Sequence, residues 1–408
     1  MKIIDRPKYL STLINVMDTP DIKVITGIRR CGKSQLLLAL IDYIKKKNSS
    51  ANIIYINLQQ MEFESLLEYH QLHEYVLSHY DRSVNNYLFV DEVQLCDGFE
   101  KAINSFHSQN ILDIYITGSN AFLLSSDLAT LFTGRTYTVE VFPFSFMEFL
   151  DYFDYKGIDE DFEEYVMTGG FAGSYLYKTV EEKYDYIKKD VYETIVTRDL
   201  VQKYKIRNKE VLNGLAAYMI DNISNLMSSN NVTHYLRENN YSITHKTIGN
   251  YINYLCNAFV FYRAKRYDLR GKKYLATENK FYLCDHSIKY AVLGTRNIDY
   301  GRMYENIVYI ELLRRGYDVY IGKLYKKEID FVATKRSEQV YIQVSSYIED
   351  EQVLKREAAP LLSIKDAYPK IIIARTHHDE YTYKGIKIVD IANWLVDNTA
   401  SRSVEITA

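Results

Sequence analysis

A glycine-rich loop holds the first residues whose types and spacing could do chemistry. Residues 27–34 read GIRRCGKS, which fills the spacing G-x-x-x-x-G-K-[ST] between the β-rich run 23–26 and the helical stretch 35–47. Glycines let backbone N–H groups turn inward around phosphates, at the positive end of a helix. We therefore predict an ATP site in which Lys33 reaches the β- and γ-phosphates and the Ser34 hydroxyl binds Mg²⁺. The other residues predicted to contact the nucleotide are Gly27, Arg30, Gly32 and Gln35.

Two carboxylates follow a second apolar run. Residues 87–90 read YLFV, as expected of a strand buried on both faces, and the run ends in Asp91 and Glu92. A carboxylate at the tip of such a strand can hold the water shell of Mg²⁺, which suits Asp91. Glu92 can then orient or deprotonate the attacking water. The alternative is an acidic turn after a core strand, but the phosphate loop upstream favours a site of ATP hydrolysis.

Two further polar groups could act on the γ-phosphate. The predicted strand 111–117 ends before Ser119 and Asn120, and either could sense the γ-phosphate and help to place the water. The alternative for them is a helix cap. Arg135 could stabilise charge on the transferring phosphoryl group, either in its own chain or in a neighbouring subunit. For Arg135 a surface salt bridge is an equally good interpretation.

The last part of the chain carries a nuclease-like pattern with a defect. Glu305 lies in a predicted helix, Asp330 begins a predicted strand, and Gln343 lies in the next strand. In nucleases with a D…(D/E)-x-K pattern, the carboxylates bind Mg²⁺ and a lysine activates water. Here Ser345 stands in the place of that lysine, and the sequence gives no argument that Lys355 replaces it. We expect a retained fold whose cleavage activity is doubtful.

The elements between these two sites suggest contact with nucleic acid. Residues 206–295 predict helices, one of them over 242–255, and then two β-rich runs at 258–266 and 273–284, which is the order of a winged helix. Eight Lys or Arg and two acidic residues lie in 242–280, a local net charge of +6. Clustered basic groups contact phosphates without regard to sequence, so double-stranded DNA is a candidate partner. The alternative is a winged helix used only for packing within the chain.

Composition excludes several other classes of protein. The chain has 408 residues, 47% of them hydrophobic, and a net charge of -3, which fits two or three globular domains. The start lacks the apolar region of a secretory signal, and no apolar run approaches the roughly 18 residues of a membrane helix. The four cysteines are scattered, so neither a disulfide framework nor a zinc site is expected. We expect a reduced, cytoplasmic protein without a membrane segment.

The chain resembles a known family as a whole. The matching pieces are GIRRCGKS, LFVDEVQ, ITGSNAFLLS, LFTGRTYTVEVFPFSFMEFL, GGFAG and TIVTRDLVQKY, and towards the end YENIVYIELLRRGYDVY, EIDFVA and YIQVS. With these it resembles the bacterial and archaeal AAA-type ATPases that have an AAA_14 domain and a C-terminal domain of unknown function, DUF4143. The resemblance implies an α/β fold: a P-loop AAA-like ATPase core with a helical lid (1–205), a winged helix (206–295) and a restriction-endonuclease-like α/β domain (296–408). A homo-oligomer is possible for such a protein.

Two functions remain open on this evidence. One is an ATPase with Mg²⁺ whose conformational switch is coupled to nucleic acid through the winged helix and the nuclease-like domain. The other is a signalling or scaffolding NTPase that gates a protein partner and has an inactive nuclease-like domain. Stimulation of ATP turnover by DNA separates the two.

Overall fold

The chain folds into two compact units. The first comprises Met1–Pro143 with Asn257–Phe259, and the second comprises Phe144–Cys256 with Val260–Ala408. The computed structural model describes residues 4, 6–118, 132, 134–239, 241, 243–271, 273–296, 298–325 and 327–397, without the side chains of 276 and 277.

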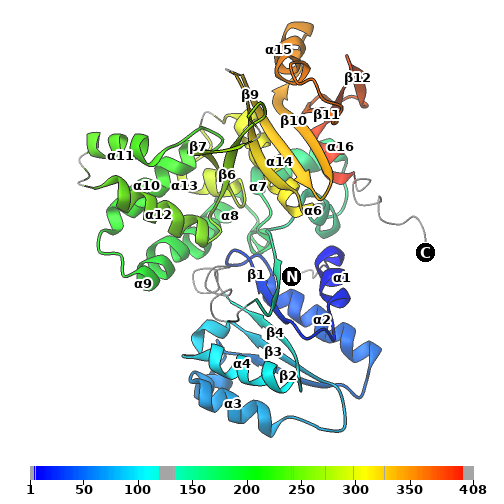
Figure 1. The fold of residues 1–408 in the computed structure, drawn as a ribbon, viewed down its shortest axis with the longest axis vertical. Helices are drawn as coiled ribbons and strands as arrows, with labels where there is room; N and C mark the ends of the chain where they lie inside the picture. Colours follow the sequence, from blue (N-terminus) through cyan, green and yellow to red (C-terminus); the bar gives the residue numbers. More distant parts are fainter. Residues whose placement is uncertain are drawn as a thin grey trace. The chain divides into compact units, whose positions relative to one another are not determined.

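The first unit is built on a parallel sheet of five strands in the order β2-β3-β4-β1-β5 (Figure 1). Its strands are β1 (Ile22–Thr26), β2 (Asn52–Asn57), β3 (Asn86–Asp91), β4 (Asp113–Thr117) and β5 (Thr136–Glu140). Its helices are α1 (Pro7–Asn15), α2 (Lys33–Lys47), α3 (Tyr69–Ser78) and α4 (Phe99–Gln109), with 3-10 turns η1 (Met61–Leu66) and η2 (Val93–Leu95).

The sheet of the first unit is buried because its central strands carry apolar side chains on both faces. Every residue of β1 and β3 is buried, and so are four of the five residues of β4. Such continuous apolar runs are typical of parallel strands covered on both sides. Because the strands are parallel, the carboxyl ends of β1, β3 and β4 lie at one edge, where the three predicted polar segments begin.

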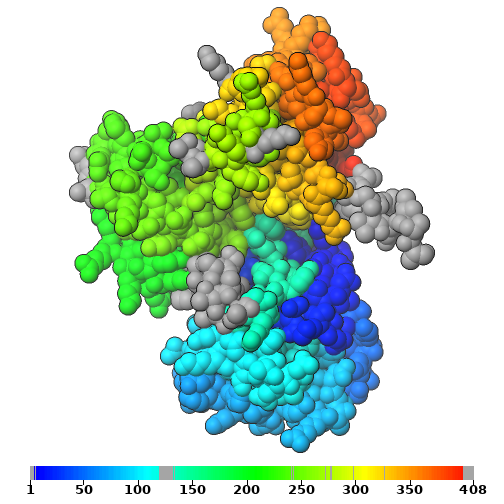
Figure 2. Space-filling view, viewed as in Figure 1, coloured from blue at the N-terminus to red at the C-terminus, as the bar shows by residue number. Residues whose placement is uncertain are grey.

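The second unit begins with helices. They are α6 (Phe146–Tyr152), α7 (Ile158–Thr168), η3 (Ala172–Leu176), α8 (Val180–Tyr186), the π-helix η4 (Ile187–Asp199), α9 (Leu200–Tyr204), α10 (Lys209–Asp221), α11 (Ser229–Glu238) and α12 (His245–Asn257). The predicted break at residues 169–170 is confirmed, because α7 ends at Thr168 and Gly169 follows with a positive φ of 69°, which favours glycine. Figure 2 shows the region from α10 to α12, in green, as a continuous surface.

The rest of the second unit is a mixed sheet of eight strands in the order β12-β13-β11-β10-β9-β8-β6-β7. The strands are β6 (Phe261–Asp268), β7 (Lys273–Leu283), β8 (Asp318–Leu324), β9 (Lys327–Lys335), β10 (Glu338–Tyr347), β11 (Lys370–Arg375), β12 (Tyr381–Tyr383) and β13 (Ile386–Asp390). The accompanying helices are α13 (Ser287–Leu293), α14 (Tyr300–Arg314), α15 (Glu351–Leu362) and α16 (Ile391–Val396). Both α14 and α15 pack against β10 (Figure 1).

The observed units differ from the predicted domains 1–205, 206–295 and 296–408. From Phe144 on, the predicted lid belongs to the second unit, where Gly170 N–H donates to Asp285 Oδ2 over 2.6 Å. The predicted wing, β6 and β7, is not a separate hairpin either, since β6 pairs in parallel with β8 and joins the C-terminal sheet. The order of elements along the chain suggested the domain boundaries. The observed units differ because hydrogen bonds join segments that are distant in the sequence.

Two expectations from composition can be compared with the structure. All four cysteines, at positions 31, 96, 256 and 284, are free. Among the helices of the described residues, none combines the length and the apolar composition that a membrane crossing requires.

Candidate functional site

The phosphate loop connects β1 to α2 at the carboxyl edge of the first sheet. Gly27 has φ 138° and Gly32 has φ 98°, a region that side chains disfavour. A Cβ atom on Gly27 would lie 2.1 Å from the carbonyl oxygen of Val141, so only glycine fits there. Gly32 is the N-cap of α2, which begins at Lys33 and has no acidic residue in its first turn. The first N–H groups of α2 are therefore a site that suits an anion.

Lys33 is held inside the loop by its own backbone. Its ammonium donates to the carbonyl oxygens of Gly27 over 2.9 Å and of Ile28 over 3.1 Å, and its side chain is buried. These carbonyls partner the buried charge until an anion offers stronger, charge-assisted hydrogen bonds. Of the other predicted loop contacts, Ser34 is half-buried, while Arg30 and Gln35 are exposed.

Arg6 supports the loop and is absent from the sequence prediction. Its guanidinium is buried and donates from Nη1 to the carbonyl of Cys31 over 2.8 Å and from Nη2 to the carbonyl of Phe142 over 2.8 Å. Burial raises the pKa of the Cys31 thiol, although Lys33 and Arg6 act against this shift. Cys31 is thus a neutral packing residue of the loop. No local motif marks Arg6, because both of its acceptors lie far along the chain.

The two carboxylates lie at the end of β3, beside the end of β4. Asp91 is buried and accepts a short hydrogen bond from the hydroxyl of Thr117, whose oxygen in turn accepts from the backbone N–H of Glu92 over 3.1 Å. Asn57 donates to the other oxygen of Asp91 over 3.4 Å. Glu92 has φ 56°, and its carboxylate accepts from Gln94 Nε2 over 2.5 Å. Sequence reasoning found Asp91 and Glu92 but missed Thr117 and Gln94.

These residues fit ATP and Mg²⁺. The glycine turn at Gly27 leaves the backbone room that a Cβ would fill, and α2 offers N–H groups to an anion. Lys33 and Ser34 would hold the phosphates and the metal, and Asp91 supplies an oxygen ligand of the kind that Mg²⁺ prefers. When bound, Mg²⁺ neutralises charge on the phosphate oxygens. Glu92 lies next to Asp91 and is the carboxylate available to orient water.

The two remaining predicted catalytic residues fare differently. Asn120 lies outside the described residues, as does Ser119. Arg135 precedes β5, and its carbonyl accepts from the N–H of Ile22 at the start of β1 over 2.9 Å. The phosphate loop follows the other end of β1, roughly 16 Å away at about 3.3 Å per residue. The backbone of Arg135 therefore lies at the opposite end of β1 from the phosphate loop, and its predicted action on a phosphoryl group, in its own chain or in a neighbouring subunit, stays a prediction.

In the second unit, the residues of the nuclease-like pattern line one cavity of about 480 Å³. Glu305 comes from α14, Asp330 from β9 and Gln343 from β10. Lys280 from β7 lies among them and was missed, because the sequence placed it in a basic wing. Burial, and then Glu305, raise the pKa of Asp330 to about 8, although Lys280 opposes this. Lys355 is exposed on α15 and pairs with Glu351 over 2.9 Å.

The basic stretch 242–280 is not one surface. Lys280 is buried, Arg266 pairs with Glu278 over 2.8 Å, and Lys272 lies outside the described residues. Arg263 donates to Asn253 on α12 over 2.7 Å. The exposed basic residues among those described are Lys246, Lys265, Arg270 and Lys273, with Arg263 beside α12.

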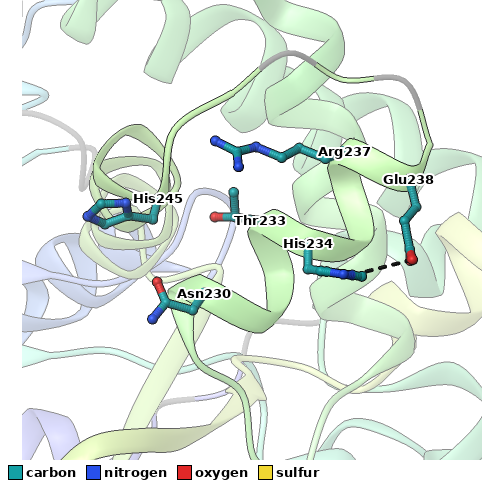
Figure 3. Close-up of a pocket in the computed structure, with 6 residues that line it drawn as sticks. All are labelled: Asn230, Thr233, His234, Arg237, Glu238 and His245. Carbon is teal, nitrogen blue, oxygen red and sulfur yellow. Dashed lines mark ion pairs between the residues drawn. The ribbon is translucent and has the colours of Figure 1, made fainter.

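A polar pocket of about 490 Å³ lies beside the start of α12 (Figure 3). Its lining residues from α11 are Asn230, Thr233, His234, Arg237 and Glu238, and α12 contributes His245. His234 and Glu238 pair across one helical turn over 3.4 Å, and Arg237 Nε donates to the carbonyl of Ile243 over 3.0 Å. Arg237 therefore fixes the turn between the two helices, and the pocket shows no arrangement that specifies one ligand.

Comparison with known proteins assigns the chain to a family. A family model described as AAA domain matches residues 19–150. A protein of Haemophilus influenzae, described as an uncharacterized protein, is 35% identical over 400 residues, which cover 97% of this chain and 99% of that protein. This chain belongs to that AAA-type family. The AAA-type protein is an ATP-binding P-loop NTPase, as the sequence predicted.

More distant similarities extend the comparison. An uncharacterized protein of Methanocaldococcus jannaschii is 28% identical to this AAA-type protein over 384 residues, covering 90% of this chain and 84% of that one. Among solved structures, the Walker-type ATPase of Pyrococcus abyssi is similar at 15% identity and a TM-score of 0.47, covering 71% of this chain and 95% of that chain.

The second family model differs from the expected one. It is described as a domain of unknown function, DUF8612, and matches residues 159–299 of the AAA-type protein, whereas the resemblance named DUF4143. The match begins at α7 and ends before α14, so it spans the predicted lid and the predicted winged helix together. A part of unknown function after the AAA domain is therefore shown, under the designation DUF8612, whereas DUF4143 for residues 296–408 stays a prediction.

Proposed function

We propose that this AAA-type protein hydrolyses ATP with Mg²⁺ in its first unit and uses the hydrolysis to drive a conformational switch that is coupled to double-stranded DNA. The observation that carries the ATPase part is the buried Lys33 in a loop where Gly27 leaves no room for a side chain. Glu92 is the proposed base or water-orienting group. Arg135 is proposed to act on the phosphates of a second copy, in a homo-oligomer.

The DNA part of the proposal rests on α12. Its exposed residues include His245, Lys246, Asn250 and Asn253, and Arg263 lies hydrogen-bonded to Asn253. Asn, Lys and Arg are the side chains that pair with base edges and phosphates in a major groove. With α10 and α11 before it and the hairpin β6–β7 behind it, α12 has the place of a recognition helix in a winged-helix-like module. The exposed Lys265 and Arg270 of the hairpin add positive charge.

A second candidate function is a nucleotide-dependent switch that gates a protein partner. It is favoured by a tyrosine cluster on β6, β7 and β8, in which Tyr274 is 61% exposed. The ring of Tyr274 lies at a tilt to the rings of Tyr267 and Tyr320, with centroids 5.4 Å and 5.1 Å away. Tyrosine is enriched at the centres of protein interfaces, so this cluster suits a protein partner.

ATP turnover measured with and without duplex DNA distinguishes the two. We expect duplex DNA to raise turnover and to bind more weakly as salt increases. Lys246→Glu should weaken DNA binding by about tenfold, because it reverses a charge on the exposed face of α12. Lys384→Glu, which reverses an exposed charge on the distant turn between β12 and β13, should leave binding unchanged. If no DNA or RNA binds or raises turnover, the nucleic-acid part of the proposal fails and the protein-partner function takes its place.

A further inference from the structure

A carboxylate cluster in the second unit, formed by Glu305, Glu328 and Asp330, surrounds a positively charged side chain of the same chain, Lys280. The ammonium of Lys280 lies 2.9 Å from Glu305 Oε1 and 2.8 Å from Glu328 Oε1. Asp330 Oδ1 lies 3.7 Å from the same nitrogen. The side chain of Lys280 is 6% exposed, so water screens these ion pairs little. One lysine from β7 thereby meets carboxylates from α14 and β9.

The predicted metal-binding side chains of the cluster have further partners within the protein. Glu305 Oε1 also accepts from the hydroxyl of Tyr282 over 2.6 Å. Asp330 Oδ2 accepts from the backbone N–H of Val344 over 2.9 Å. Gln343 turns its oxygen towards the N–H of Asp330, at 3.4 Å, and its nitrogen towards Glu357, at 3.3 Å. The predicted ligands are thus engaged with protein groups.

A divalent metal does not fit this arrangement as it stands. A metal bound to Glu305 and Asp330 would have the Lys280 ammonium within a few ångströms, and two cations at that distance in a buried site repel strongly. Among the described residues, no group of three or more His, Cys, Asp or Glu side chains is placed to hold a metal ion. Glu305, Asp330 and Gln343, the residues of the doubtful nuclease-like site, therefore do not fit a divalent metal as the structure arranges them.

We propose that the ammonium of Lys280 is the resident cation of this cluster and occupies the place that a divalent metal would need. The cluster is then a fixed charge centre that joins β7, α14 and β9, and the second unit performs no metal-assisted cleavage there. Ser345 stands where the nuclease pattern has the lysine that activates water. Lys280, the lysine of this cluster, instead pairs with the carboxylates that would bind the metal. This inference is independent of the proposed ATPase activity, which belongs to the first unit.

Titration of the nucleotide-free, full-length chain with Mn²⁺ tests the proposal, with free Mn²⁺ followed by electron paramagnetic resonance. We expect the unaltered chain to show no Mn²⁺ binding that depends on Asp330. Lys280→Met leaves the carboxylates without their cation. The variant should therefore gain a site that binds Mn²⁺ at least about tenfold more tightly than the unaltered chain does. Adding Asp330→Asn to Lys280→Met should remove the new site. Arg266→Met, which removes another cation of the same hairpin, should gain none, because the carboxylate that Arg266 pairs with is Glu278 and not one of the three around Lys280.

Two results overturn the proposal. One is Mn²⁺ binding by the unaltered chain that disappears in Asp330→Asn, because the metal would then share the cluster with Lys280. The other is a folded Lys280→Met variant that binds no Mn²⁺, because the carboxylates would then not be a cation site. Should Lys280→Met fail to fold, the unaltered chain and Asp330→Asn decide between the two outcomes by themselves.

Discussion

Charged side chains of both units are held by partners from their own chain. In the first unit the carboxylate of Glu92 accepts from Gln94 Nε2, and Lys33 donates to loop carbonyls. Each charge is therefore partly satisfied before any substrate binds, and each must exchange its partner to act.

Glu92→Gln should separate binding from hydrolysis. The amide keeps the size of the side chain but cannot accept a proton from water, so we expect ATP to bind normally and turnover to fall by roughly 100-fold. Fluorescent-nucleotide binding and phosphate release measure the two effects. Glu100→Gln, on an acidic residue in the first turn of α4, is the matched control and should change neither. Turnover that is unaffected by Glu92→Gln would contradict the role given to this carboxylate.

Asp330 should make the stability of the second unit depend on pH. Burial and Glu305 raise the pKa of Asp330 to about 8 in the folded state, against about 3.9 in an unfolded chain, with Lys280 and Glu328 as its other charged neighbours. Between these values the folded state holds one more proton than the unfolded state. The free energy of unfolding should therefore fall as pH rises from about 4 to about 8, and level off above that.

Asp330→Asn should flatten this dependence, because the amide does not titrate. Urea unfolding at several pH values, followed by the fluorescence of the single Trp, at position 394 in α16, reports on the second unit. Asp318→Asn, on an exposed carboxylate of β8, should keep the slope of the unaltered chain. An equal slope in Asp330→Asn would show that this group titrates normally.

The residues of the proposed ATP site could be named from the sequence only where they belong to one short motif. Gly27, Lys33 and Ser34 occupy fixed places in one short motif, and the spacing alone identifies them. Arg6 and Thr117 act through contacts with residues distant in the sequence, so no motif contains them. Lys280 shows the same limit of prediction from local sequence. Its positive charge suggested contact with DNA, whereas in the structure its side chain is buried in a carboxylate cluster.

At the scale of elements, Arg375 forms a buried ion pair within the sheet of the second unit and a second, exposed ion pair with helix α7. Arg375 on β11 donates to both oxygens of Asp390 over 2.9 and 3.0 Å, and to Asp159 on α7 over 2.5 Å. Arg375 and Asp390 are buried, whereas the side chain of Asp159 is 57% exposed. The pair within the sheet is therefore desolvated, and the link to α7 is open to water.

Removing the two carboxylates should have unequal effects. Asp390→Asn leaves Arg375 with a buried charge, so we expect a loss of about 3–5 kcal/mol in the free energy of unfolding. Asp159→Asn removes an exposed partner and should cost less than about 1 kcal/mol. Urea unfolding followed by the fluorescence of the single Trp measures both. Equal losses would contradict the account that the buried pair of Arg375 with Asp390 stabilises the fold more than the exposed pair with Asp159.

Most elements were predictable, and their grouping was not. Apolar runs and helical spacing indicated β1, β3, β4, α12 and the series α14 to β10, all of which the structure contains. The hairpin β6–β7 was also predicted, yet its partner β8 begins 35 residues after β7 ends, at Asp318 after Leu283. Local sequence patterns predict that a strand forms, but they do not predict which strand it pairs with. For this reason the domain boundaries at 205 and 295 differ from the observed units.

At the scale of the whole molecule, the net charge of -3 is an average over very different sites. Positive charge in 242–280 divides between exposed groups, such as Lys246 and Lys265, and groups paired inside the fold, such as Lys280. Only the exposed groups can contact phosphates of DNA. The size of a charged stretch in the sequence therefore overstates the surface it provides.

ATP turnover by the unaltered chain and by Lys33→Ala, measured as phosphate release with Mg²⁺, tests the central claim most directly. Lys33 supplies the only side-chain charge of the loop that is buried among the carbonyls of Gly27 and Ile28 in the described structure. The account predicts Mg²⁺-dependent turnover in the unaltered chain and a fall of at least about 100-fold in Lys33→Ala. Full turnover in Lys33→Ala, or no ATP binding by the unaltered chain, would contradict it.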